Sequence, residues 1–478
     1  MAHAQHAPFH PIVKAAIPLC IVIPAFVWFQ YVGYTQYASH HFFLADIGVM
    51  DRALANTLAG DFMRSPISDW SYFAVHFRPV LLLFIPAYAL FNHILTFSLL
   101  LNLCLAGAAI PLYYFATAKT HNRWLSAIIT AAYLANHFTL SLHLALHPES
   151  LLMPGFFVMF LAIQRRKTLM YWAGVIWCLS IKEDIALFVA FYGVYLALIA
   201  RDRHTTRRQG FLTIAVAGAW LIIAVVVMSI LKPDEGVYKG GVAFLERYRS
   251  MGDSWLDIVV YAVTHPWNII YRIFSRRALY ILIASAGFLP LLHPRSLSLL
   301  IPPALIFLIS DFKPMNRLLY YYSYPFLPFL FLSTVEGTGW LLSKVTNKNI
   351  RYIPAFILIV VSIVSFLSST RMEQMKSRPF PITAHHRALQ PLIREHIPPP
   401  ATIVAQYEIF CQIPHTYKVF PLWLENMKHA DYIIIDTTRP SPDLTPEDRE
   451  QIMEIVSNKP FLSAVEHDGY KIYKREKE

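Results

Sequence analysis

The residues best suited to chemistry begin with a short acidic motif, Asp46-Ile47-Gly48, which follows the first apolar stretch of the chain. A carboxylate at the boundary between membrane and water can take a proton from a hydroxyl group, or can hold a divalent metal that bridges a phosphate. The alternative is that Asp46 caps the next helix, because Asp and Gly both favour turns and helix ends. That helix is predicted to run from Asp51 to Leu58, and we interpret Asp51 as its cap or as a charge on its face.

Two further motifs place a histidine beside a charged residue. His76 and Arg78 precede an apolar segment; an arginine can bind phosphate through two parallel hydrogen bonds, and a histidine can donate to phosphate or ligate a metal. In His147-Pro148-Glu149, the imidazole and the carboxylate together suit a metal or a sugar hydroxyl. The alternatives are anchoring of a helix end at the membrane interface for the first motif, and helix capping by Glu149 for the second.

Lys182-Glu183-Asp184 puts three charges between two apolar segments with almost no loop. Ionisable groups near the membrane interior are costly, so they are paired or functional. Lys182 therefore either meets a phosphate or neutralises Glu183 or Asp184. Arg317, in a later turn, is another candidate for binding phosphate, and its alternative is a side chain that reaches the lipid interface.

The elements that must position these residues are mostly membrane helices. The chain has 478 residues, of which 56% are hydrophobic and 15% charged, which excludes disorder and argues against a single soluble domain. Five apolar stretches are near the ~20 residues that span the hydrocarbon of a bilayer: 12–32, 94–117, 124–144, 211–231 and 353–369. Shorter stretches are interpreted as short or tilted crossings: 150–163, 169–182, 184–200, 278–292 and 297–311.

The distribution of positive charge predicts the topology. The net charge is +11, and basic residues gather in alternate short loops near residues 119–123, 165–167, 201–208, 295 and 344–351. Loops of this kind face the cytoplasm, and charge spread over helix ends argues against binding of nucleic acid. With residues 79–91 as a re-entrant or surface helix, the count gives about 11 crossings, an N-terminus inside and a C-terminus outside. All the acid and histidine motifs above then share the outer face.

The tail has a different character from the rest of the chain. Residues 371–478 are polar, and we predict strands at 402–405, 418–421 and 432–436, a hairpin over 462–473 around Asp468-Gly469, and a helix over 388–396. This length suffices for a small external α/β domain, after a membrane domain over 1–370 whose first external loop is 33–78. The four cysteines have no ligand or disulfide spacing and are interpreted as small core residues.

The order of these motifs resembles that of a family of predicted bacterial and archaeal multipass membrane proteins, domain of unknown function 2079. The resemblance covers roughly residues 40–478, with Arg78 standing where the family usually has a serine. That family in turn resembles the GT-C superfamily of integral-membrane glycosyltransferases, which use polyprenyl-phosphate sugars and carry an acidic residue in the first external loop. Asp46 matches that acid by position.

The resemblance implies a glycosyltransferase of the cytoplasmic membrane that moves a sugar from a polyprenyl phosphate to an extracytoplasmic acceptor, with inversion. Asp46 would be the base, and Arg78, Lys182 and Arg317 would hold the donor phosphate. Acceptor or metal positioning would fall to five residues: His76, His147, Glu149, Glu183 and Asp184. A divalent metal, Mg or Mn, would sit on Asp46 or Glu149. The alternatives are a lipid or solute transporter or flippase, and a scaffold whose tail binds a partner.

Overall fold

The computed structural model describes residues 11–68, 70–199, 204–232, 245–345, 347, 350–371, 379–439, 441, 443–458 and 460–476. A few side chains within these ranges, including that of Asp46, lie outside the description. The contacts divide the chain into two units, which we describe one at a time. The first comprises the described parts of residues 1–29, 101–225 and 237–377, and the second those of 30–100, 226–236 and 378–478.

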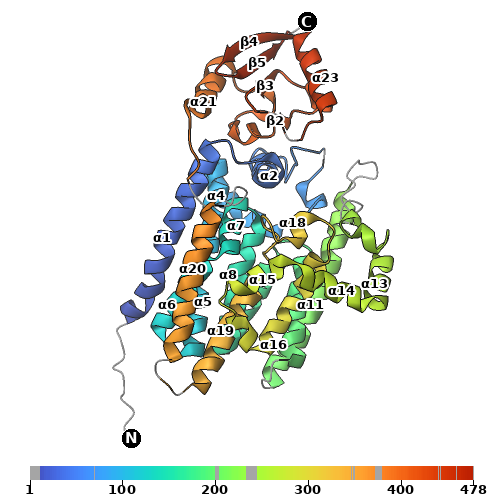
Figure 1. The fold of residues 1–478 in the computed structure, drawn as a ribbon. Coiled ribbons are helices and arrows are strands. Elements are labelled where there is room, and N and C mark those ends of the chain that lie inside the picture. The colour runs from blue at the N-terminus through green and yellow to red at the C-terminus, as the bar shows by residue number, and fades with distance from the viewer. Residues whose placement is uncertain are drawn as a thin grey trace. The chain divides into compact units, whose positions relative to one another are not determined.

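The first unit is built from helices (Figure 1). The longer ones are α5 (Ala109–Thr120), α6 (Arg123–Ala135), α7 (His137–Ala145), α8 (Leu152–Arg165), α9 (Thr168–Leu179), α10 (Ile185–Val194), α13 (Trp255–Thr264), α14 (Pro266–Ser275), α15 (Arg277–Ala284), α19 (Leu327–Lys344) and α20 (Ile353–Arg371). Shorter turns are η4 (Pro148–Leu151), η5 (Tyr195–Ile199), η6 (Glu246–Met251), η7 (Leu289–Leu292), α16 (Pro294–Leu297), η8 (Ser298–Leu300), α17 (Ile301–Pro303), η9 (Ala304–Leu308), α18 (Lys313–Asn316) and η10 (Ile350–Tyr352). Three helices, α1 (Pro11–Ala38), α4 (Ile94–Gly107) and α11 (His204–Leu231), continue across the division between the units.

The apolar stretches of the sequence are helical, as predicted, but the expected count of about 11 crossings is not confirmed. Among the described residues, three helical segments are long and apolar enough to cross a membrane: Ala16–Ala38, Ile94–Thr120 and Thr206–Leu231. A fourth is possible if Arg123–Leu134 and His137–Ala145, which are bent by 46°, form one span. The shorter apolar helices are Pro79–Leu90, Thr168–Leu179, Ile185–Ile199, Pro294–Leu308 and Ile353–Ser368.

Local chemistry explains where the predicted spans are interrupted. The stretch 124–144 bends at Asn136, whose extended backbone ends α6 and whose side-chain oxygen accepts a hydrogen bond from the backbone N–H of Phe138 at the start of α7. An asparagine in this position caps a new helix instead of continuing the old one. The stretch 278–292 turns at Gly287 and Phe288, both with positive φ. The first helix, by contrast, is longer than predicted and ends at Ala38 instead of residue 32.

The α8–α9 hairpin is the closest helix pair that positions predicted site residues. Gly155 and Gly174 face each other, and a Cβ added to Gly174 would lie 2.9 Å from the carbonyl oxygen of Gly155. Arg166 ends α8 in a left-handed conformation, and the chain returns antiparallel as α9. The indole N–H of Trp177 donates to the carbonyl of Leu151 over 2.8 Å. The end of α9 therefore lies beside the start of α8.

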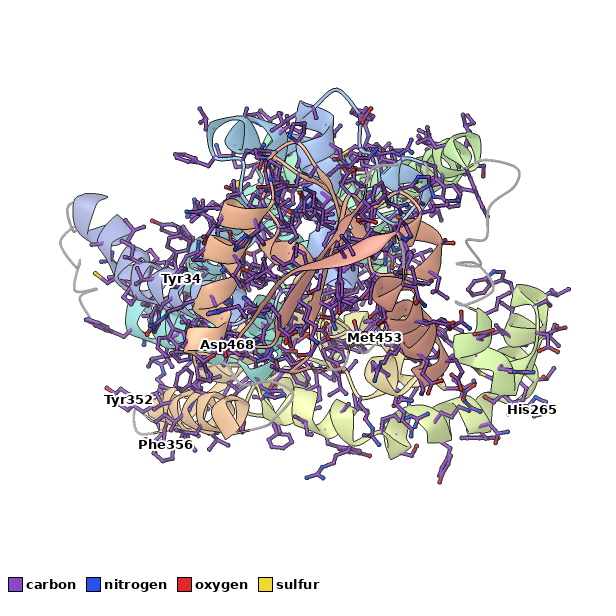
Figure 2. The ribbon with its side chains drawn as sticks, turned by 90° about the horizontal axis from the view of Figure 1, so that it is seen from above. Tyr34, His265, Tyr352, Phe356, Met453 and Asp468 are labelled. Carbon is purple, nitrogen blue, oxygen red and sulfur yellow. The ribbon has the colours of Figure 1, made fainter. Side chains whose placement is uncertain are left out.

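Several helices expose apolar side chains in the manner of lipid-facing surfaces. In the most apolar 18-residue stretch of α11, only 11% of the residues are buried, and Ile222, Val226 and Ile230 are exposed on this helix. Tyr352, at the end of η10, and Phe356, in the first turn of α20, are also exposed and point outward (Figure 2). Apolar surface of this extent is unfavourable in water and suits a bilayer.

The second unit combines the first loop with the tail. Its helices are η1 (Leu44–Gly48), α2 (Val49–Leu58), η2 (Tyr72–Ala74), η3 (Pro79–Phe84), α3 (Ile85–Leu90), α21 (Ala384–His396), η11 (Phe410–Gln412), α22 (Leu424–Met427) and α23 (Pro446–Ser457). Its strands are β1 (Thr402–Ala405), β2 (Lys418–Pro421), β3 (Tyr432–Asp436), β4 (Phe461–His467) and β5 (Tyr470–Arg475). All five predicted strand segments are confirmed. The predicted domain boundary at residue 370 stays a prediction. It divides a membrane domain from an external domain, whereas the two units described here are defined by contacts within the chain.

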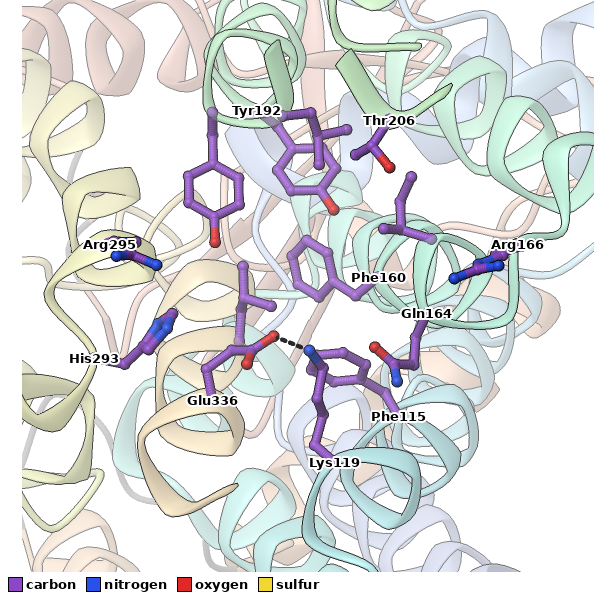
Figure 3. Close-up of a pocket in the computed structure, with 14 residues that line it drawn as sticks. Phe115, Lys119, Phe160, Gln164, Arg166, Tyr192, Thr206, His293, Arg295 and Glu336 are labelled. Atoms are coloured by element: carbon purple, nitrogen blue, oxygen red, sulfur yellow. Dashed lines mark ion pairs between the residues drawn. The ribbon is translucent and has the colours of Figure 1, made fainter. Parts of the chain in front are cut away.

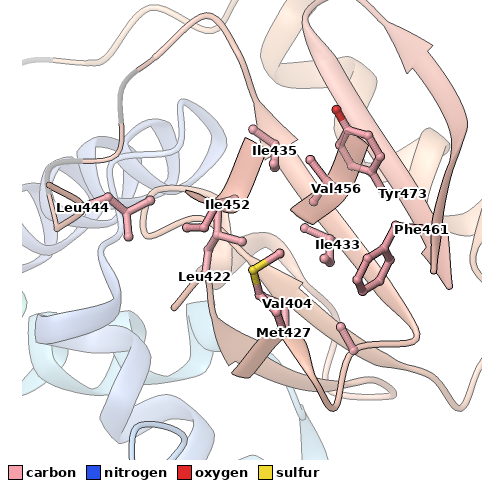
Figure 4. Packing of buried hydrophobic residues seen from close by; sticks show 11 residues of the cluster. Val404, Leu422, Met427, Ile433, Ile435, Leu444, Ile452, Val456, Phe461 and Tyr473 are labelled. Carbon is pink, nitrogen blue, oxygen red and sulfur yellow. The ribbon is translucent and has the colours of Figure 1, made fainter. Parts of the chain in front are cut away.

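The sheet of the tail has the order β2-β1-β3-β5-β4, with β1 parallel to β2 and β3, and β5 antiparallel to β3 and β4. The central strand β3 is buried along its whole length, which explains its continuous apolar sequence. On one side of the sheet, Ile433 and Ile435 pack with Ile452 and Val456 of α23 (Figure 4). The tail therefore has its own hydrophobic core.

Candidate functional site

Two of the predicted motifs meet in the first unit, at the open end of the α8–α9 hairpin. The Glu149 side chain, in η4 just before α8, is 0% exposed. The ring N–H of His147 donates to its Oε2, and the Lys182 ammonium, just after α9, lies 3.5 Å from its Oε1. The antiparallel hairpin thus brings His147-Pro148-Glu149 and Lys182-Glu183-Asp184 to one place.

Aromatic residues complete this cluster, which we call the Glu149 cluster: His147, Glu149, Lys182, Asp184, Tyr321 and Tyr324. Lys182 is also 3.2 Å from Oδ2 of Asp184, and that oxygen accepts a hydrogen bond of 3.0 Å from the Tyr324 hydroxyl. The imidazole of His147 stacks on the Tyr321 ring with 4.0 Å between centroids. Glu183 is half-buried in the same turn.

The charges of the Glu149 cluster favour the ion-pair interpretation of Lys182. One ammonium lies between two carboxylates, so its charge is already compensated. Both Glu149 oxygens are also engaged, one by Lys182 and the other by His147, which leaves a divalent cation no free oxygen on this carboxylate. Among the side chains that the structure describes, no group of three or more His, Cys, Asp or Glu residues has the arrangement of a metal site.

Arg317 belongs to the same unit and differs from Lys182 in its surroundings. It is exposed at the end of α18, four residues before Tyr321 of the Glu149 cluster. No hydrogen bond or ion pair joins its guanidinium to another described side chain. A planar guanidinium in this state keeps its donors available for a phosphate.

In the second unit, the Asp46 motif is part of the single turn η1, and the Asp46 side chain lies outside the described residues. The neighbouring Gly48 is described, and a Cβ there would lie 2.9 Å from Sγ of Cys411 in the tail. The glycine is therefore needed for close packing. Arg52, buried in α2, reinforces this contact by donating to the carbonyls of Ile413, Pro414 and Tyr417. These contacts fix the backbone of the motif against the tail.

Asp51 is buried, which overturns its interpretation as a cap or a surface charge. Its side chain is 2% exposed, and its Oδ1 accepts a hydrogen bond of 2.8 Å from the Tyr88 hydroxyl. Its Oδ2 lies 2.8 Å from Nε2 of His415, whose other ring nitrogen contacts the side chain of Asn92. Burial alone raises the pKa of the Asp51 carboxyl, but His415, Arg52 and Tyr88 together hold that pKa below its ordinary value.

A cavity of about 310 Å³ adjoins this pair. His415, Asn92 and His93 line it together with Gln390 and Arg394 of α21. An imidazole held by a carboxylate on one nitrogen can carry a proton to or from a bound molecule. The cavity therefore places an acid–base group beside a space of the size of a small-molecule site.

The remaining predicted residues, His76 and Arg78, precede η3 in the second unit. The Arg78 side chain is 1% exposed, and that of His76 is half-buried beside Tyr72. A buried guanidinium does not serve as an anchor in the lipid interface, so the burial of Arg78 argues against that alternative.

A third polar cluster lies at the end of β3. His385 Nε2 is 3.0 Å from Oδ2 of Asp436, and the His385 ring stacks on Tyr470 with 4.2 Å between centroids. His386 contacts His40, and burial together with His386 and Arg439 lowers the pKa of His40 to about 3. His40 is therefore neutral at ordinary pH.

Sequence reasoning missed His415, Tyr88, Asn92 and the His385–Asp436 pair. His415 stands alone between two strands, and it is 364 residues from Asp51. A lone histidine in a turn has no local pattern to mark it. Asp51 gave one usable signal, since an aspartate two residues into an otherwise apolar helix face requires a partner when buried.

The chain combines a unit of apolar helices with a unit that contains a small mixed sheet, a composition that agrees with the predicted GT-C-type membrane fold. The chain belongs to the family described as "Predicted membrane protein (DUF2079)", whose model matches residues 39–477. Both predicted resemblances are thus confirmed at the level of family and fold. The first external loop over 33–78, the orientation of the chain and the identity of the membrane stay predictions.

Solved structures support the fold over nearly the whole chain. ArnT from Cupriavidus metallidurans bound to undecaprenyl phosphate matches with a TM-score of 0.55 at 12% identity, over 97% of this chain and 98% of that one. The same protein in the apo state matches with a TM-score of 0.53, also at 12% identity and with the same coverage. The oligosaccharyltransferase AglB from Archaeoglobus fulgidus reaches only 0.36 at 10% identity, over 89% of this chain and 70% of that one, which carries no argument. No curated protein sequence matches significantly.

Proposed function

We propose that this protein is a membrane glycosyltransferase that moves a sugar from a polyprenyl phosphate to an acceptor on the outer face of the cytoplasmic membrane. The observation that carries the proposal is the end-to-end correspondence with ArnT, which was solved with undecaprenyl phosphate bound. A shared fold alone does not define an activity, so the roles of residues must rest on the chemistry of this chain.

Asp46 is the proposed general base. Its carboxylate takes the proton of the acceptor hydroxyl while the hydroxyl oxygen forms a bond to the anomeric carbon of the donor sugar. The bond from that carbon to the phosphate oxygen breaks, and the electron pair leaves with the polyprenyl phosphate. Attack from the side opposite the leaving group inverts the anomeric centre. The packing of Gly48 against Cys411 supports this role, because it gives the motif a fixed backbone.

The leaving phosphate gains negative charge, and fixed cations stabilise it. Arg317 is the best candidate for this role, because its guanidinium is exposed and carries no ion pair to another described residue. Arg78 is a second candidate from the other unit. Lys182 binds phosphate in this proposal only if it leaves Glu149 or Asp184, so its first role is to hold those carboxylates in place.

The Glu149 cluster and His76 are proposed to position the acceptor. Carboxylates and imidazoles accept and donate hydrogen bonds to sugar hydroxyls, and Glu183 and Asp184 are partly exposed at the cluster. No step of the proposal requires a metal. The acceptor itself is a glycan, lipid or protein of the cell envelope.

The test is mass spectrometry of surface glycans and polyprenyl-linked sugars in a deletion strain, complemented with wild type, Asp46→Asn or Asp61→Asn. Asp61 is exposed in the same loop, so it is a matched control for the loss of one charge. We expect the deletion to lack a surface modification and to accumulate a lipid-linked sugar. Wild type and Asp61→Asn restore the modification, and Asp46→Asn does not.

Two outcomes contradict the proposal. If Asp46→Asn restores the modification fully, the base is another residue. If surface glycans and donors are unchanged in the deletion strain while the protein is expressed in the parent, glycosyl transfer is the wrong activity, and a transporter or flippase becomes the better hypothesis.

A further inference from the structure

The end of α8 that is remote from the Glu149 cluster carries a second polar site, which the proposed function does not use. A cavity of about 330 Å³ lies between α5, α8, α10, α16 and α19 of the first unit. Glu149 lies in η4, just before the start of α8, and Arg166 directly follows the end of α8. Because α8 has 14 residues, its two ends are about 21 Å apart.

Cations outnumber carboxylates in the polar lining of this cavity, which also contains Gln164, Thr206 and His293. Lys119, Arg166 and Arg295 come from three different segments, and Glu336 is the one carboxylate among the lining residues. Glu336 pairs with Lys119 over 2.7 Å. Arg166 and Arg295 lie on opposite sides of the cavity, and the Lys119–Glu336 pair lies between them (Figure 3). The guanidinium groups of both arginines form no ion pair with another residue in the described part of the chain.

The other walls are apolar and aromatic. Phe115, Phe160, Tyr192, Leu196 and Leu332 line the cavity between the cations. A soluble anion would gain nothing from these walls, whereas a lipid would place its phosphate among the cations and its glycerol and upper chain against the rings. The volume is within the range of sites for small molecules and headgroups.

We propose that this cavity binds the phosphate headgroup of an anionic membrane lipid. The loops that contribute Lys119, Arg166 and Arg295 are those that the distribution of charge assigns to the cytoplasmic side, where anionic lipids meet basic pockets between helices. The site is independent of the proposed glycosyl transfer, and Glu336 competes with the lipid for Lys119.

The test is a calorimetric titration of the full-length protein in detergent with dioctanoyl phosphatidic acid, and in a separate arm with inorganic phosphate. We expect saturable binding of the lipid and much weaker binding of inorganic phosphate. A cation near a membrane surface contributes about fivefold in affinity, so Arg166→Gln/Arg295→Gln should weaken lipid binding roughly 25-fold.

Two single variants provide controls. Arg165→Gln removes the same charge one residue away, from a side chain that lies over the Tyr114 ring at 5.2 Å and does not line the cavity, so binding should not change. Glu336→Gln releases Lys119 and should tighten binding about fivefold. A gain in affinity cannot come from a misfolded protein.

Four outcomes of the titrations described above overturn the proposal, and a fifth comes from an Arg317→Gln variant. The four are the absence of saturable lipid binding, equal loss of affinity in Arg165→Gln and the double variant, unchanged affinity in Glu336→Gln, and equal affinity for inorganic phosphate. Binding that disappears in Arg317→Gln and persists in the double variant would belong to the proposed donor site, and it would also overturn this inference.

Discussion

Two of the buried carboxylates that hold a histidine, Glu149 and Asp51, are built in different ways. Glu149 and His147 are two residues apart, and Lys182, which follows the second helix of the same hairpin, compensates the charge of Glu149. Asp51 and His415 are 364 residues apart; the Tyr88 hydroxyl and the Asn92 amide hydrogen-bond to them, and Arg52 adds a positive charge beside Asp51. The first pair closes a local structure, whereas the second joins the first loop to the tail within one unit.

The difference shows two ways to bury a negative charge. A cation compensates the charge directly but leaves a second ion buried if the carboxylate is lost. At Asp51 the charge is shared among hydrogen bonds from Tyr88 and His415 and the field of Arg52, whose guanidinium also donates to three backbone carbonyls and so keeps those partners if the carboxylate is lost. The Glu149 cluster should therefore be the more fragile of the two to a single substitution.

Glu149→Gln should have the largest effect. It leaves Lys182 with one carboxylate and removes the acceptor of His147, and breaking a buried pair of this kind costs about 3–5 kcal/mol. Equilibrium unfolding of the purified protein in mixed micelles measures the loss. The double variant Glu149→Gln/Lys182→Met should recover part of it, because the largely buried ammonium is gone and the charge that remains, on Asp184, is partly exposed. A double variant as unstable as the sum of the two single variants would show that the pair is not coupled.

Asp51→Asn should cost less, about 2 kcal/mol, and the cost should depend on pH. The pKa of Asp51 is depressed in the folded protein, so its stabilisation is complete above the ordinary value of about 3.9 and is lost as the pH falls through the folded pKa. Unfolding at pH 7, 5, 4 and 3 should show a constant difference from wild type down to pH 5 and a shrinking one below pH 4. A difference that widens with acid would contradict the assignment.

Tyr321→Leu should destabilise the Glu149 cluster by about 1 kcal/mol, since it removes the ring on which His147 stacks and keeps an apolar side chain. The matched change in the same segment is Tyr320→Leu, because Tyr320 is exposed and contributes its backbone carbonyl to Ser141. Thermal unfolding should lower the midpoint of Tyr321→Leu alone. Equal shifts for both variants would mean that the stack adds nothing.

Asn92→Ala should have the smallest effect, about 0.5 kcal/mol, because Asn92 is exposed and touches only the outer nitrogen of His415. Proton NMR of labelled histidine should show a change at the His415 ring, while the unfolding midpoint moves little. If Asn92→Ala destabilised the protein as much as Asp51→Asn does, the three side chains of Asn92, His415 and Asp51 would be equally important, and Asn92 would not be a minor support of the His415–Asp51 pair.

The comparison also separates what the sequence predicts from what it does not. The strands β1, β2 and β3 begin and end at the predicted residues, because short apolar runs between turn residues mark buried strands. The hairpin turn is equally local, with Asp468 and Gly469 both at positive φ. The sequence also marked the motifs at Glu149 and Lys182 as candidate sites on one face, but the only partners it offered Lys182 were a phosphate, Glu183 and Asp184.

The rest depends on contacts between distant segments. Nothing near His415 indicates Asp51, and nothing near Asp51 distinguishes a buried carboxylate from a helix cap. The number of spans was also beyond reach, because several apolar stretches contain breaks such as Asn136 and Gly287 that divide them into short helices. Composition reports how apolar a stretch is, but not whether it stays straight.

The α8–α9 hairpin has a consequence for how the protein enters the membrane. Glu149 is synthesised before Lys182, and the two glycines at the crossing let the helices close on each other without a third partner. The lysine thus meets its counter-ion inside the hairpin that carries both. An ion pair formed in this way lowers the cost of transferring the pair through the translocation channel, so the hairpin can integrate as one unit before the later helices exist.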